Sequence, residues 1–271
     1  MSQVIQFAKY QGTGNDFMLL DNRAGIYSLT QADVAALCHR RFGIGADGLM
    51  LLETTSEADF RMVYYNADGG ISTLCGNGSR CMVAFAQKLG LVQSGAVRFE
   101  AADGLHDAQI LSDGQVALQM ADVTEMATDA TGIFLNTGSP HYIFWTENAD
   151  SEPVDLKGRE TRYDPRFAPG GTNVNFVERR AADLYVRTYE RGVEAETLSC
   201  GTGVTAAAIA ASGTALGSFD IPVETPGGWL RVQYQKTGPE TATAVCLTGP
   251  AQWVFEGTID LEALLVNFRK L

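Results

Sequence analysis

The chain has 271 residues, which is enough for one large domain or for two domains of ordinary size. Hydrophobic residues make up 45% and charged residues 19%, a composition that is typical of a folded globular protein and excludes a largely disordered one. The net charge of −12 argues against a nucleic-acid partner, because phosphate binding needs a basic surface, whereas a small zwitterionic ligand stays compatible.

The first half of the chain opens with an alternating segment at residues 4–10, which predicts a strand. A helical pattern follows Thr30, whose residue type suits an N-cap. GIGADG at 43–48 has the spacing of a dinucleotide fingerprint, but it follows a helical pattern instead of a strand, so we interpret it as a turn. A second helix is predicted after Cys75, and alternation returns at 114–120.

The second half repeats this mixture of short strands and few helices. Alternation at 183–190 predicts a strand, and small apolar residues after Cys200 predict a helix. Further strands are predicted at 230–236 and 243–249, and a last helix after Asp260. The pattern indicates the α+β fold class.

The N-terminus has no continuous apolar core behind basic residues, and no later stretch approaches the roughly 18 apolar residues of a spanning helix. We therefore expect a cytoplasmic protein with no membrane partner. The five cysteines contain no C-x-x-C pair, so the sequence predicts neither a disulfide framework nor a metal site.

One sequence motif occurs twice. CGNGSRCMVAFAQKLG at 75–90 and CGTGVTAAAIAASG at 200–213 both start with C-G-x-G, continue as an apolar helix and end in glycine. The two cysteines lie 200 − 75 = 125 residues apart, about half the chain. This predicts two pseudo-repeated domains, residues 1–119 and 120–248, each presenting one cysteine at the start of a helix.

A cysteine at a helix N-terminus is suited to proton transfer. Unpaired backbone N–H groups and the positive end of the helix dipole bind anions and favour a thiolate. The same N–H groups can hold a substrate carboxylate while the sulfur reaches the neighbouring carbon. Two such helix ends, acting on opposite faces of one α-carbon, would invert its configuration. For Cys38, Cys81 and Cys246 we expect ordinary packing instead.

Six motifs carry a family likeness: GTGNDF at 12–17, YNADGG at 65–70, LCGNGSRC at 74–81, NTGSPH at 136–141, GTNVNFVE at 171–178 and YERGVEAETLSCGTG at 189–203. In this order they resemble diaminopimelate epimerases, members of the cofactor-independent amino-acid racemases. The likeness extends from residue 7 to about residue 257. Considered without it, Asn15 and Asn66 would be turn residues, and Glu190 with Arg191 a surface ion pair.

The resemblance implies two β-roll-like domains, each wrapped around a central helix, with the active site in the cleft between them. It further implies that a strand at 249–257 returns to the first domain and that residues 258–271 form an added tail. No cofactor is expected. The expected partner is a small amino-acid substrate used in lysine biosynthesis, and a homodimer is one candidate assembly.

The resemblance also assigns roles to residues. Cys75 and Cys200 are expected to be the acid and base of the reaction. The remaining expected site residues are those that bind the reacting carboxylate, Gly76, Asn77, Gly201 and Thr202; those that hold the distal end of the substrate, Asn15, Asn66, Asn173, Glu190 and Arg191; and two accessory residues, His141 and Ser139.

Three departures from the family pattern bear on the substrate. Many members have Asn in place of Ser139 and Gln in place of Gly48, and this chain has one more residue between Arg191 and Thr197. The leading hypothesis is conversion of LL- to meso-diaminopimelate. Racemisation of another amino acid on the same scaffold is the first alternative, and a non-catalytic amino-acid-binding or redox-sensing protein is the second.

Overall fold

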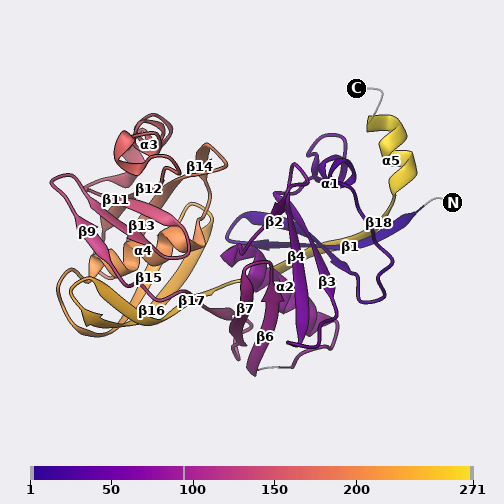
Figure 1. The fold of residues 1–271 in the computed structure, drawn as a ribbon, viewed down its shortest axis with the longest axis horizontal. Coiled ribbons are helices and arrows are strands. Elements are labelled where there is room, and N and C mark those ends of the chain that lie inside the picture. Colours follow the sequence, from indigo (N-terminus) through magenta and orange to yellow (C-terminus); the bar gives the residue numbers. More distant parts are fainter. Residues whose placement is uncertain (1–2, 94, 269–271) are drawn as a thin grey trace. The chain divides into compact units, whose positions relative to one another are not determined.

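The computed structural model describes residues 3–93 and 95–268, and the chain divides into two units (Figure 1). Unit 1 contains Met1–Val116 and Pro250–Leu271, and unit 2 contains Ala117–Gly249. The division after Val116 falls close to the predicted boundary at residues 119 and 120. None of the helices described is long and apolar enough to cross a membrane.

Unit 1 is a mixed sheet with one helix at its centre. Its strands and helices are β1 (Val4–Gly12), β2 (Asn15–Asp21), α1 (Gln31–Cys38), β3 (Gly48–Glu53), β4 (Phe60–Asn66), β5 (Ile71–Ser72), α2 (Gly76–Lys88), β6 (Gly95–Ala101), β7 (Gly104–Ile110), β18 (Gln252–Asp260) and α5 (Leu261–Phe268). The strands pair in the order β18, β1, β2, β3, β4, β6, β7, and β2–β3 and β4–β6 are the parallel pairs. Strands β1 to β4 and β7 pack against α2.

Unit 2 repeats this arrangement. Its elements are β8 (Val116–Gln119, whose first residue belongs to unit 1), β9 (Met126–Thr128), β10 (Ile133–Asn136), β11 (Pro140–Thr146), α3 (Val154–Arg162), β12 (Asn173–Arg179), β13 (Leu184–Glu190), β14 (Ala195–Thr197), α4 (Gly201–Ala211), β15 (Gly217–Thr225), β16 (Gly228–Gly238) and β17 (Thr241–Gly249), with short 3-10 turns at Ala149–Ser151 and Pro165–Phe167. Strands β10 to β13, β15 and β16 pair with the same alternation of antiparallel and parallel neighbours as β1 to β4, β6 and β7. The predicted α+β fold with two repeated domains is confirmed.

The composition of α4 explains why strands surround it. The helix is apolar on every side, and Val204 to Ala210 are at most 1% exposed. A helix that is hydrophobic all round has no face for solvent and must be enclosed. Its small side chains also allow close approach, since a Cβ on Gly203 would lie 2.4 Å from Asn175 Oδ1.

Local sequence signals fix several element ends. Thr30 caps α1 and forms a capping box with Asp33, as its residue type predicted. The β1–β2 hairpin turns through Thr13 and Gly14, both with positive φ, and this turn brings Asn15 to the start of β2. All five predicted strands and all four predicted helices coincide with observed elements.

The C-terminal segment differs from the expected tail. β18 continues past residue 257 to Asp260, because Gly257–Asp260 pair with Val4–Phe7 of β1. Leu261 and Leu264 of α5 then join the core formed with Val34 and Leu37 of α1. Residues 258–268 therefore belong to unit 1, and 269–271 lie outside the residues described.

Candidate active site

The two cysteines at the repeated motif occupy equivalent positions. Cys75 is the N-cap of α2 with φ −120° and ψ 116°, and Cys200 is the N-cap of α4 with φ −117° and ψ 111°. Neither side chain makes the capping hydrogen bond to its helix. Each sulfur therefore lies at the positive end of a helix dipole but does not cap the helix.

The other cysteines are placed differently. Cys38 and Cys81 are at most 2% exposed, and burial raises the pKa of each thiol to about 12. Cys246 lies on β17, partly buried, and burial raises its pKa as well. These thiols stay protonated near neutral pH, which agrees with the packing role expected for them.

In unit 1 the structure brings Cys75, Asn15 and Asn77 together. The Cys75 thiol donates to Asn15 Oδ1 at 3.6 Å, and Asn77 Nδ2 donates to the same oxygen at 3.4 Å. Thr13 Oγ1 lies 3.4 Å from Asn77 Oδ1. Asn15, which was expected to hold the distal end of a substrate, thus lies beside the sulfur.

Asn66 is another expected site residue in unit 1. It ends β4 opposite Gly48 of β3, is exposed, and uses its backbone N–H in a turn to Gly70. The surroundings of Gly48 explain why this chain has glycine at a position where many family members have glutamine. A Cβ at this position would lie 2.6 Å from Tyr64 Cε2 and 2.7 Å from Tyr65 O, so glycine is the residue that fits.

In unit 2 the corresponding group surrounds His141, which is fully buried. His141 Nε2 lies 2.9 Å from Thr202 Oγ1 and 3.0 Å from Ser139 Oγ. Thr202 Oγ1 in turn lies 3.5 Å from Cys200 Sγ. The expected accessory residues Ser139 and His141 are therefore joined to Cys200 through Thr202.

The protonation state of His141 follows from its surroundings. Burial lowers its pKa to about 3, and the charge of Arg191 acts in the same direction. Asn175 Nδ2 donates to Tyr142 O at 3.3 Å, and a carbonyl can only accept. The amide nitrogen therefore faces His141 Nδ1 at 3.1 Å, so the neutral ring carries its proton on Nε2, towards Thr202.

Asn175 is a residue that the sequence analysis missed. It follows Asn173 at the period of a strand, so both side chains of β12 point to one face. Asn173 Nδ2 donates to Pro140 O at 2.8 Å and to Ser139 Oγ at 3.2 Å. The alternation of two buried asparagines in TNVNF was the available signal.

Glu190 and Arg191 lie where β13 turns towards β14. Arg191 is exposed, and its backbone N–H donates to Asn173 Oδ1 at 2.8 Å. Glu190 accepts from Thr197 Oγ1 at 2.9 Å. The additional residue is accommodated in this turn, where Glu194 has φ 60° and its carboxylate accepts from Arg162 Nε at 3.2 Å and Tyr163 OH at 3.0 Å.

A cavity of about 540 Å³ borders Arg191 on the side of Arg166, Tyr142 and Phe167. Its lining includes neither Cys200 nor Thr202. Within unit 2 this cavity is therefore separate from the start of α4.

Known proteins resemble the chain over most of its length. The family model described as diaminopimelate epimerase matches residues 7–126 and 133–254. A protein named diaminopimelate epimerase from Flavobacterium psychrophilum is 48% identical over 93% of this chain and 98% of its own. One from Chlorobaculum tepidum is 43% identical over 92% and 99%.

Solved structures show the same fold at low sequence identity. A PhzF-family phenazine biosynthesis protein from Bacillus anthracis has a TM-score of 0.74 at 15% identity, covering 95% of this chain and 99% of its own. A probable proline racemase from Agrobacterium radiobacter has a TM-score of 0.68 at 18% identity, covering 94% and 92%.

Proposed function

The chain belongs to the diaminopimelate epimerase family, and we propose that it interconverts LL- and meso-diaminopimelate by a two-base reaction at one α-carbon. The enzyme is an isomerase. The observation that carries the proposal is the repeated helix start, with Cys75 and Cys200 in matching backbone conformations at the N-caps of α2 and α4.

The reaction balances without a cofactor. One cysteine, as the thiolate, takes the α-proton and becomes a thiol. The resulting carbanion takes a proton from the other cysteine on the opposite face, and that cysteine becomes the thiolate. The α-carbon is inverted, and the reverse reaction exchanges the two roles.

The α-carboxylate binds to backbone N–H groups in the first turns of the two helices, at Gly76 and Asn77 and at Gly201 and Thr202. These donors also stabilise the negative charge that develops as the α-proton leaves. His141 keeps Thr202 in place, because its Nε2 proton is directed at the Thr202 hydroxyl.

The distal end of the substrate carries an ammonium and a carboxylate, so its site must pair both charges. Glu190 supplies a carboxylate and Arg191 a guanidinium, and Asn66 and Asn173 supply amides. Asn15 acts at the reacting end instead, since its amide oxygen lies 3.6 Å from the Cys75 sulfur.

The test is to incubate the protein with LL-diaminopimelate and separate the stereoisomers by chiral chromatography. A panel with proline, alanine, glutamate and lysine covers racemisation of other amino acids. We expect meso-diaminopimelate and no racemised single amino acid. A Cys200→Ala preparation, purified in parallel, controls for host epimerase. Conversion of a panel member in place of diaminopimelate, or equal conversion by the Cys200→Ala preparation, would overturn the proposal.

A further inference from the structure

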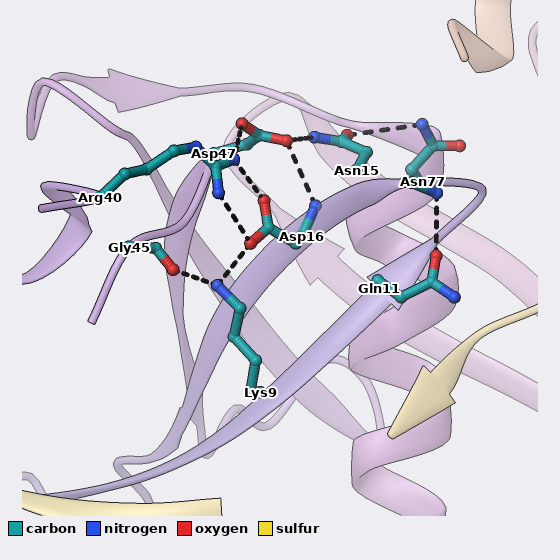
Figure 2. Close-up of polar contacts among 9 residues, drawn as sticks. Lys9, Gln11, Asn15, Asp16, Arg40, Gly45, Asp47 and Asn77 are labelled. Carbon is teal, nitrogen blue, oxygen red and sulfur yellow. Dashed lines mark hydrogen bonds and ion pairs between the residues drawn. The ribbon is translucent and has the colours of Figure 1, made fainter. Parts of the chain in front are cut away.

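A cluster of four charged side chains lies beside Asn15 in unit 1: Lys9, Asp16, Arg40 and Asp47 (Figure 2). Arg40 Nη2 lies 2.6 Å from both Asp16 Oδ1 and Asp47 Oδ1. Lys9 Nζ lies 2.6 Å from Asp16 Oδ2. Burial acts to raise the pKa of Asp16, but hydrogen bonds from Arg40 and Lys9 outweigh it and lower that pKa, so Asp16 stays ionised.

Asp47 connects this cluster to the site. Its Oδ2 accepts from Asn15 Nδ2 at 2.7 Å and from the backbone N–H of Asp16 at 3.2 Å (Figure 2). An ionised carboxylate only accepts hydrogen bonds, so the nitrogen of the Asn15 amide must face Asp47. The oxygen of that amide is then directed away from Asp47.

A second charged residue, Arg80, orients the side-chain amide of Asn77. Arg80 is fully buried, and its Nη2 donates to Asn77 Oδ1 at 2.9 Å. A guanidinium only donates, so the nitrogen of the Asn77 amide faces Asn15 Oδ1. The Asp47 carboxylate at one end of this chain of hydrogen bonds and the Arg80 guanidinium at the other are therefore consistent. Both require that Asn77 Nδ2 donates to Asn15 Oδ1.

As a result, Asn15 Oδ1 faces the Cys75 thiol and accepts its hydrogen bond. We propose that Asp47 is a positioning residue for Cys75, acting through the Asn15 amide that it orients. An acceptor on the thiol favours the protonated form, so Asp47 helps to keep Cys75 as the proton donor in the substrate-free protein. The inference rests on the proposed function only for its catalytic consequence.

The test measures the alkylation rate of Cys75 by iodoacetamide at neutral pH, with peptide mass spectrometry reporting Cys75 and Cys200 in the same sample. In Asp47→Ala the nitrogen of the Asn15 amide loses its acceptor, and the amide is held only by Asn77, which weakens the hold of its oxygen on the Cys75 thiol. We expect Cys75 to react about fivefold faster, the ratio that corresponds to the loss of one hydrogen bond, and the rate of Cys200 to stay unchanged. The same variant should lower kcat for diaminopimelate more than it changes KM.

Two further variants separate positioning from a structural role. Arg40→Gln removes the ion pair of Asp47 but keeps its carboxylate, so the Cys75 rate should stay within about twofold of the parent. In an Asn15→Ala background, Asp47→Ala should cause no additional change, because the two residues act in series. Thermal unfolding checks that each variant is folded, and Asp47→Ser carries the same comparison should Asp47→Ala unfold.

The proposal is overturned if a folded Asp47→Ala or Asp47→Ser variant leaves the Cys75 rate unchanged. It is equally overturned if Arg40→Gln reproduces the change, or if the change persists in full in the Asn15→Ala background. None of these alkylation results depends on turnover, so a failure of the proposed function is recognised separately, by the absence of diaminopimelate conversion in the parent protein.

Discussion

Replacing either Cys75 or Cys200 with alanine is expected to abolish epimerisation, with turnover reduced at least about 10³-fold. In the proposed reaction each sulfur serves one face of the α-carbon, so its removal leaves that face without an acid or base. The loss should be the same for LL- and meso-diaminopimelate as starting material, because every inversion uses both residues. Initial rates measured by chiral chromatography in both directions check this expectation.

The remaining cysteines supply matched controls for these substitutions. Cys246→Ala removes a partly buried thiol from β17, and Cys81→Ala removes a fully buried one from α2 itself. Both variants should keep the parental turnover and change only thermal stability. Appreciable turnover in Cys75→Ala or in Cys200→Ala would mean that the proton-transfer pair has been assigned wrongly.

Mild oxidation is expected to link Cys75 to Cys200 and to eliminate activity, and a thiol reductant should restore it. The proposed reaction needs one sulfur at each face of a single carbon, so in the absence of substrate the two sulfurs should be able to meet. A disulfide requires Cα atoms about 4.4–6.8 Å apart. Thiols at helix N-termini also tend to be reactive.

Peptide mapping of the oxidised protein, with activity followed in parallel, measures this outcome. Cys246→Ala should oxidise as the parent does, whereas Cys200→Ala should form no such link. A bridge that involves Cys38, Cys81 or Cys246 instead, or full activity with Cys75 and Cys200 linked, would contradict a shared site.

The elements that carry the cysteines could be predicted because their signals are local. The start of α1 is encoded by Thr30 and Asp33, three residues apart, and the starts of α2 and α4 by the same C-G-x-G motif. The repeat then implied a repeated fold, because each apolar helix needs strands to enclose it.

Other parts of the fold lacked a local signal. α3 is only nine residues long and contains Gly158 in its interior, which weakens any helical pattern. The parallel pairing of β11 with β12 joins segments on either side of that helix. Strand pairing of this kind depends on tertiary packing, which alternation in one segment does not encode.

The polar network around the site could not be predicted either, because several of its contacts join residues that are far apart in the sequence. Asn15 and Asp47 are 32 residues apart, and Asp47 lies in GIGADG, which reads as a turn. Arg80 has the residue type of an exposed helix position, yet it is fully buried and bound to Asn77. The sequence named Asn15 and Asn77 as candidate site residues, but it did not indicate the charges that orient their amides.

Isotope incorporation tests the two-base account most directly. Epimerisation of LL-diaminopimelate in heavy water is stopped at low conversion, and mass spectrometry of the separated stereoisomers gives the deuterium content at the α-carbon. In the proposed reaction one cysteine, as the thiolate, removes the proton, and the opposite thiol, equilibrated with solvent, delivers a deuteron. The account therefore predicts a labelled product and a nearly unlabelled substrate pool, and the same asymmetry from meso-diaminopimelate. Equal labelling of substrate and product from the earliest time points would show a single base exchanging its proton with solvent and would contradict the assignment of Cys75 and Cys200 as the acid/base pair.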